Sequence, residues 1–102
     1  MRAKKGHQPM TGAERIAGER GRQIVEEGWT PEHDDRHAHG ELAIAAACYA
    51  LHGIYPSPLP QWPWAKKWDK RSKHGRVRRL EIAGALIAAE IDRLQRADVD
   101  EE

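Results

Sequence analysis

The sequence predicts a small all-α protein: a three-helix bundle with one short extra helical turn and a connection rich in proline and tryptophan. Three observations lead to this prediction. A helix-start signal lies at residues 11–14, an alanine-rich apolar run covers residues 41–52, and apolar residues recur at spacings of three and four between residues 77 and 94. A chain of 102 residues suits one domain with one core.

The first helix is predicted from a capping box. Thr11 and Glu14 have the Thr-x-x-Glu spacing in which hydroxyl and carboxylate satisfy free backbone amides at a helix start. We expect the helix to run to residue 27 and to end at Gly28, because glycine readily adopts the conformation that terminates helices. Its expected inner face consists of Ile16, Ala17, Ile24 and Val25.

Two further helices follow. Thr30 and Pro31 form a start signal, with threonine as N-cap and proline at the first helical position, for a short turn that ends near Gly40. Residues 41–52 are apolar on nearly every side, which predicts a central helix buried all round. Cys48 lies in this run and is expected to be a small buried hydrophobe.

The connection after residue 53 and the last helix are also distinct in composition. Four prolines, Pro56, Pro58, Pro60 and Pro63, exclude a regular helix between them. The last helix is predicted from an apolar seam made of Val77, Leu80, Gly84, Ile87, Ile91 and Leu94, which Ala83, Leu86 and Ala88 widen. We expect residues 1–10 to be a basic flexible tail, residues 11–97 to form the helical domain, and residues 98–102 to be an acidic tail.

Composition narrows the protein class. The N-terminal residues lack the apolar stretch of a secretory signal, and the longest apolar run, residues 42–51, is half the roughly 20 residues that span a bilayer. A single cysteine allows no intramolecular disulfide. We therefore expect a cytoplasmic protein with no membrane partner. Because so short a chain buries little surface, a homo-oligomer is expected as well.

The segment 26–41 is acidic and rich in histidine. It holds six carboxylates and three histidines. If residues 31–38 are helical, His33 and His37 share a face at the i, i+4 spacing that can grip one divalent metal ion, with Asp34, Asp35 and Glu41 as further ligands. The alternative is that Asp34 and Asp35 cap the next helix, that the histidines bond to neighbouring backbone, and that the other acids are solvated. Trp29 would then anchor the segment to the core, and no cofactor is firmly implied.

Tryptophans and cations are concentrated in residues 62–79. This segment holds Trp62, Trp64 and Trp68 together with eight of the seventeen lysines and arginines, among them Lys66, Lys67, Arg71, Arg76 and Arg79. Aromatic faces beside clustered cations are typical of sites that stack bases and pair phosphates. The alternative is that the tryptophans cover the core while the cations form a solvated edge, or pair with the acidic segment within the molecule or across a dimer.

These motifs resemble two families. The segments 28–37, 40–50 and 83–94 are similar to a family of small uncharacterised bacteriophage and prophage proteins, whose members share Gly-Trp-Thr-Pro-Glu-His-Asp-Asp-x-His and Gly-Glu-Leu-Ala-x-Ala-Ala-Ala-Cys-Tyr-Ala. The resemblance implies an accessory protein in an infected or lysogenic bacterium. More weakly, residues 27–30 with Asp34 and Asp35 resemble the RyR domain, which is suspected of sensing nucleotide-type ligands, although the His-Pro pair of that domain is absent here.

Three functions compete at this stage. The first is a counter-defence module that sequesters a nucleotide-derived anion without turnover, its ligand held by Trp29, His37, His39 and the tryptophans and cations of residues 62–79. The second is an inhibitor that binds a host protein or a nucleic acid through the basic segment. The third is an enzyme similar to the all-α MazG-type pyrophosphohydrolases, with Asp34, Asp35, Glu41, Glu90 or Asp92 holding a metal ion, although the paired Glu-x-x-Glu signature of that family is missing.

Overall fold

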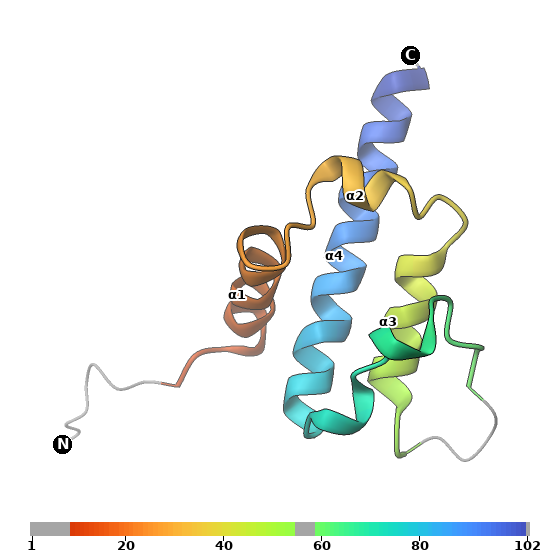
Figure 1. The fold of residues 1–102 in the computed structure, drawn as a ribbon. Coiled ribbons are helices and arrows are strands. Elements are labelled where there is room, and N and C mark those ends of the chain that lie inside the picture. The colour runs from red at the N-terminus through yellow and green to blue at the C-terminus, as the bar shows by residue number, and fades with distance from the viewer. Residues whose placement is uncertain (1–8, 55–58, 102) are drawn as a thin grey trace, which may run out of the picture.

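The computed structural model describes residues 9–54 and 59–101, and every regular element within those ranges is a helix, so the predicted all-α class is confirmed (Figure 1). The elements in chain order are α1 (Gly12–Val25), α2 (Pro31–Asp35), α3 (Glu41–Leu51), the short 3-10 turns η2 (Lys66–Trp68) and η3 (Arg71–Lys73), and α4 (Arg76–Glu101). Residues 1–8 of the tail predicted at residues 1–10 lie outside the described residues, as do two of the loop prolines, Pro56 and Pro58.

The helix-start signals act as predicted. The Thr11 hydroxyl accepts a hydrogen bond from the Glu14 amide (3.1 Å), and the Thr11 amide donates to the Glu14 carboxylate (2.8 Å), so the capping box is complete. The Thr30 hydroxyl caps α2 by accepting from the His33 amide at 3.2 Å. Gly28, with a φ of 74°, follows α1, which ends at Val25, two residues before the expected end.

The core lies between α3 and α4, which run antiparallel and side by side (Figure 1). Small side chains line this contact, and they let the two backbones approach closely. The buried residues of the cluster are Leu42, Ala45, Ala46, Tyr49, Ile82, Ala83, Leu86 and Ala89. Cys48 is fully buried, as predicted, and its thiol donates to the carbonyl of Pro60 at 3.3 Å.

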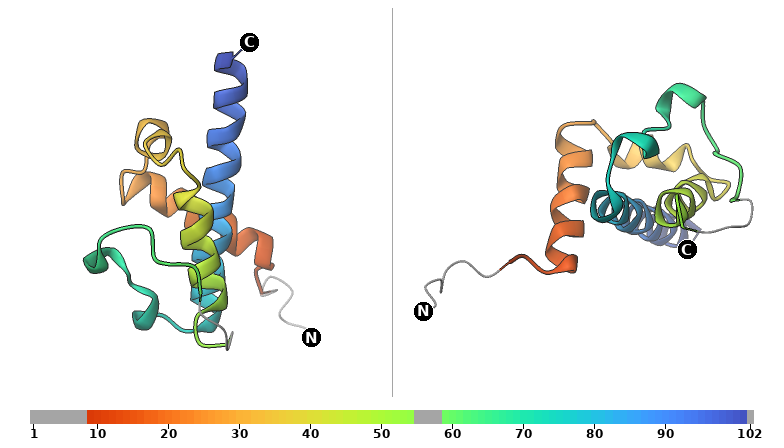
Figure 2. Two further views of the ribbon diagram at one scale, coloured as in Figure 1. Left: turned by 90° about the vertical axis from the view of Figure 1, so that its right-hand side faces the viewer. Right: turned by 90° about the horizontal axis from the view of Figure 1, so that it is seen from below.

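Helix α1 crosses α4 steeply instead of running along it (Figure 2). The prediction of its inner face was wrong for three of four residues: Ala17 is exposed, and Ile24 and Val25 are 43% and 82% exposed. Only Ile16 reaches α4, where it lies on Gly84. The buried residues of α1 are instead Glu19 and Gln23, which are 3% and 0% exposed. Three ion pairs join α1 to α4: Arg15–Glu81, Glu19–Arg78 and Arg20–Asp92.

The apolar seam predicted for the last helix is not the core. Ile87, Ile91 and Leu94 are each about half exposed (48%, 51% and 48%), and Val77 and Leu80 are exposed too. The residues of α4 that are buried in the cluster with α3 are Ile82, Ala83, Leu86 and Ala89. Of the three residues expected to widen the seam, Ala83 and Leu86 are therefore in the core. Helix α4 also continues to Glu101, beyond the expected end at residue 97. Within the described ranges, no helix is both long and apolar enough to span a bilayer.

Candidate functional site

A continuous chain of aromatic rings joins α2 to the connection before α4. Each ring contacts the next at a centroid distance between 5.0 and 5.9 Å. The order of the rings is Trp29, His33, His37, Trp64, Trp62 and Tyr49. The fold therefore brings together two segments that the sequence analysis treated separately, the acidic-histidine segment and the tryptophan-rich connection.

The α2 end of this chain is fixed by a buried carboxylate. Asp34 is fully buried, and it pairs with the Arg20 guanidinium of α1 at 2.9 Å and with Nδ1 of His33 at 2.8 Å. A buried carboxylate needs such partners to offset its lost hydration. Trp29 packs against the core cluster and stacks on His33 with ring planes 8° apart. Asp34 thus ties α1 to α2 and orients the first ring pair.

The predicted metal ligands have partners within the protein. Asp34 is bonded as above, Asp35 accepts from Arg96 at 2.7 Å, and Glu41 accepts from the His39 amide at 2.7 Å. His33 and His37 lie together, with ring centroids 5.1 Å apart. Over residues 9–54 and 59–101, no three histidine, cysteine or acidic side chains converge in a way that could hold a metal ion. A bound metal stays a prediction. The alternative, in which Asp34 and Asp35 cap the next helix, was wrong: both pair with arginines, and the N-cap of α3 is Gly40, which has no side-chain cap.

His37 occupies the centre of the chain of rings. Its imidazole touches both His33 and Trp64. Burial lowers the pKa of His37 below its ordinary value, and the neighbouring His33 acts in the same direction. The neutral ring is therefore favoured in the folded protein. His39, by contrast, has a side chain that is 90% exposed, and it lies outside this chain of contacts.

Two of the three clustered tryptophans are structural. Trp62 and Trp64 are partly buried against the core cluster and meet each other edge to face. The Trp62 indole donates to the carbonyl of Ala65 at 3.2 Å, and the Arg71 guanidinium lies over its ring at 5.2 Å from the centroid. Trp68 differs from them, because it is 57% exposed.

The arginines predicted to hold phosphate are engaged inside the molecule. Arg71 forms a two-point pair with Asp69, with distances of 2.8 and 2.6 Å, and this pair lowers the pKa of the Asp69 carboxyl. Arg76 donates to the carbonyl of Ala50 at the end of α3, and Arg79 donates to the carbonyl of His74. These three side chains fasten the connection and α3 to the start of α4.

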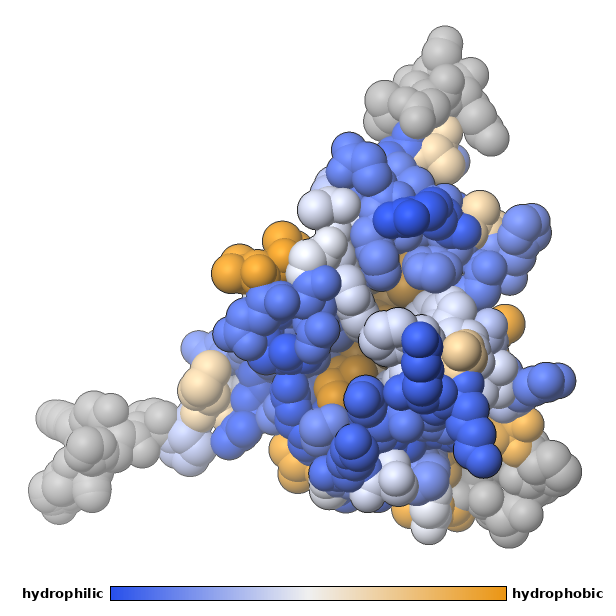
Figure 3. Space-filling model, in the orientation of Figure 1, coloured by the Kyte–Doolittle hydropathy of each residue, from blue (hydrophilic) through white to orange (hydrophobic). Residues whose placement is uncertain are grey.

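The lysines behave differently from the arginines. Each of the four lysines in the described ranges is exposed, and none has an ion-pair partner there. They are Lys66, Lys67, Lys70 and Lys73, all within eight positions around Trp68. The Lys67 ammonium lies 5.1 Å from the centre of the Trp68 ring. A strongly hydrophilic surface covers this part of the face seen in Figure 3. We call these four lysines with Trp68 the tryptophan–lysine surface.

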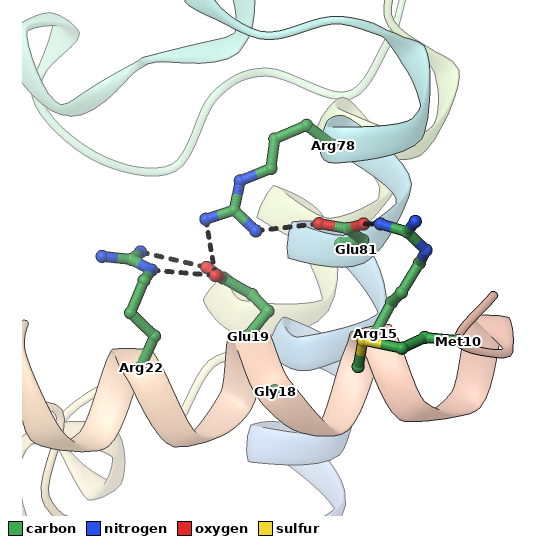
Figure 4. A pocket seen from close by; sticks show the side chains of 7 residues that line it. All are labelled: Met10, Arg15, Gly18, Glu19, Arg22, Arg78 and Glu81. Atoms are coloured by element: carbon green, nitrogen blue, oxygen red, sulfur yellow. Dashed lines mark hydrogen bonds and ion pairs between the residues drawn. The ribbon is translucent and has the colours of Figure 1, made fainter. Parts of the chain in front are cut away.

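Sequence reasoning missed an ion-pair network in the groove between α1 and α4 (Figure 4). Glu19 accepts from both Arg22 (2.9 Å) and Arg78 (2.6 Å), and Arg78 continues to Glu81, which also binds Arg15. Burial would raise the pKa of Glu19, but the hydrogen bonds from Arg22 and Arg78 outweigh it, so the pKa lies below its ordinary value. The network lines an open pocket of about 240 Å³. The signals available in the sequence were the i, i+3 spacings of Glu19 with Arg22 and of Arg78 with Glu81.

The acidic residues considered for an enzyme are also paired. Glu90 accepts two hydrogen bonds from Arg93, at 2.9 and 3.1 Å, on the same face of α4. Asp92 lies 3.9 Å from Arg20. Neither carboxylate converges with Asp34 or Asp35 on a common metal position in the described residues.

Comparison with known proteins gives no relative: no family model matches the chain, and no curated protein or solved structure matches it significantly. The site must therefore be interpreted from its own geometry.

Proposed function

We propose that the protein binds single-stranded nucleic acid through the tryptophan–lysine surface, by stacking a base on Trp68 and pairing phosphates with the surrounding lysines. This was the second of the three functions considered from sequence. The observation that carries it is that the arginines and the lysines differ in their partners within the protein. Every described arginine except Arg36 bonds to a carboxylate or a backbone carbonyl, whereas Lys66, Lys67, Lys70 and Lys73 have no such partner.

The chemistry of the surface suits a chain of phosphates. Residues 66–73 hold five cations and one carboxylate, and Arg71 neutralises that carboxylate, so the field around Trp68 is strongly positive although the whole protein has a net charge of only +1. Flexible ammonium groups tolerate many backbone geometries, and an exposed indole stacks on any base. Recognition would therefore be electrostatic and tolerant of sequence.

A compact nucleotide site at Trp62 and Trp64 is less well supported. Those two rings pack on each other, on His37 and on Tyr49, and Arg71, Arg76 and Arg79 are bonded within the protein. Sequestering a nucleotide there would require several of these contacts to break. Free mono- and dinucleotides nevertheless form a direct comparison in the experiment.

The test is fluorescence anisotropy of labelled oligo(dT) and oligo(U) at low salt with the intact protein. We expect binding that weakens linearly on a log–log plot as salt rises. Trp68→Ala should reduce affinity about 5- to 150-fold, the range of 1–3 kcal/mol per stacked base, and Trp68→Phe should retain most of it. Lys67→Gln should weaken binding more than Arg36→Gln, a control that removes one positive charge from α2's C-terminal end.

Two results would contradict the proposal. The first is no binding to either oligonucleotide at low salt. The second is binding that Trp68→Ala and a Lys66→Gln, Lys67→Gln, Lys70→Gln, Lys73→Gln variant leave unchanged. Tight binding of a free nucleotide with no preference for oligonucleotides would favour the small-ligand function instead.

A further inference from the structure

The exposed apolar seam on the C-terminal half of α4 is the feature that the fold leaves unexplained. Ile87, Ile91 and Leu94 are spaced by four and three residues, which places them on one stripe of the helix. Each is about half exposed (48%, 51% and 48%). We call these three residues the α4 seam. A row of large aliphatic side chains in water is unfavourable, and such rows mark interaction sites.

The intramolecular packing of α4 does not use this seam. Helix α3 covers the neighbouring stripe, which includes Ile82, Leu86 and Ala89. Helix α1 crosses α4 at Gly84 and so covers the helix over a short length only (Figure 2). Among the described residues, therefore, nothing lies along Ile87, Ile91 and Leu94 in the way that α3 lies along the other side.

The spacing of the seam indicates what kind of partner fits it. Alternating intervals of three and four repeat every seven residues, and this repeat keeps an apolar row facing a second helix that runs nearly along the first. A crossing helix such as α1 needs no such repeat. The positions that flank the seam hold Ala88, Gln95 and Ala97, which carry no charge, and Glu90, which Arg93 neutralises. Depletion of free charge is typical of the centre of an interface.

The length of α4 also indicates that the α4 seam is a contact surface for a second helix. A helix of 26 residues is about 39 Å long, and the C-terminal end of α4 projects beyond α2 and α3 in Figure 1. A projecting helical end gains little from its own hydrogen bonds in water and is normally stabilised by packing. The core of the single chain is also poor in large side chains, since five of its ten buried hydrophobic residues are alanines.

We infer that the α4 seam is the contact of a two-fold symmetric homodimer, in which Ile87, Ile91 and Leu94 of one protomer pack on the same residues of a second copy. A second copy is the occupant we favour because the seam is self-complementary: it is an apolar helical stripe whose flanking charge, Glu90, is already paired with Arg93, and a second stripe of the same kind fits it. A two-fold interface uses the same patch on both chains. The tryptophan–lysine surface is not part of this contact, so the inference stands independently of the proposed function.

Sedimentation velocity and light scattering of the full chain test this inference. We expect a species of about 23 kDa, twice the 11.6 kDa of one chain, at micromolar concentration. Ile91→Asp should weaken association by about a hundredfold or more, because it places a charge at the centre of the contact. The matched control is Ile54→Asp, since Ile54 is 58% exposed and lies just past the C-terminal end of α3, away from the projecting end of α4.

The remaining measurements separate folding from association. Circular dichroism should show unchanged helix content in Ile91→Asp; if that variant unfolds, Ile91→Gln with Leu94→Gln replaces it. An Ile91→Cys variant should form an interchain disulfide under mild oxidation, whereas Ile54→Cys should not. A wild-type chain that remains monomeric at a concentration on the order of 100 micromolar, about a hundredfold above a micromolar Kd, would overturn the inference. So would a dimer that survives both seam variants in folded form.

Discussion

Ile16 of α1 lies directly on Gly84 of α4, so closely that a Cβ atom added at residue 84 would be 2.5 Å from the Cδ1 atom of Ile16. Ion pairs such as Glu19–Arg78 also join the two helices. The glycine is thus required by close approach, since its φ angle is an ordinary helical one.

The first prediction concerns this contact. Gly84→Ala should lower the free energy of unfolding by about 1 kcal/mol. The added methyl group clashes with Ile16, and this destabilisation exceeds the stabilisation from the higher helix propensity of alanine. Gly21→Ala is the control: nothing lies within 4 Å of a Cβ there, so it should stabilise the protein. The loss should shrink in an Ile16→Val background, which lacks the Cδ1 atom. Urea unfolding measures all three, and an equal gain from both glycine substitutions would contradict the packing described.

The second prediction concerns Glu19 and acid. The pKa of Glu19 is lowered in the folded state, so its contribution to stability is complete above the unfolded value of 4.5 and is lost as the pH falls below that value. Glu19→Gln should cost about 1–3 kcal/mol at pH 7, towards the lower end because Arg22 and Arg78 are one-third exposed.

The control for this prediction is the pH dependence itself. Urea unfolding at pH 7 and at pH 3.5 should differ less for Glu19→Gln than for the wild type, since the variant has no carboxyl to protonate at this position. Equal acid sensitivity in the two proteins would exclude Glu19 as a principal acid-labile group.

The third prediction concerns His37. Its pKa is lowered in the folded protein, so the unfolded chain binds the proton more readily and stability declines as the pH falls below 6.5. Because the ring touches Trp64, protonation should also change the tryptophan emission. Nuclear magnetic resonance titration of the imidazole should give a midpoint below 6.5, and His37→Gln should reduce the slope of stability against pH between 6.5 and 5. A midpoint above 6.5 would refute the buried position of the ring.

The fourth prediction concerns Cys48. Burial raises the pKa of its thiol, which is fully buried and bonded to the Pro60 carbonyl. Ellman's reagent should therefore react much more slowly with the folded protein than with the protein in concentrated guanidinium chloride. Fast reaction in the native state would indicate that the α3–Pro60 contact opens readily.

The helices were predictable from local chemistry, whereas their packing was not. Thr11, Thr30 and the alanine-rich run of α3 act through short-range rules, so capping and burial could be inferred from sequence. The docking of α1 could not, because its buried residues Glu19 and Gln23 are polar, and Arg78, which binds Glu19 from α4, lies 59 residues away in sequence. A rule that buries the most apolar face fails where ion pairs hold a helix in place.

The candidate site was predictable in part. The sequence identified the tryptophans and cations, and it also suggested that some of the tryptophans would be structural. Which cations would be free depended on tertiary contacts: Arg76 reaches the end of α3, and Arg71 reaches Trp62 and Asp69. Composition treats arginine and lysine alike as positive charges, so it could not separate the two roles.

The difference between the paired arginines and the exposed lysines has a chemical consequence. Ammonium groups react with acylating reagents and with lysine acetyltransferases, whereas guanidinium groups do not. Acetylation of Lys66, Lys67, Lys70 and Lys73 would remove the free charge around Trp68 while leaving intact the ion pairs of Arg20, Arg71 and Arg78 that hold the helices together. One modification reaction would thus remove the positive charge of the tryptophan–lysine surface and leave the ion pairs between the helices unchanged.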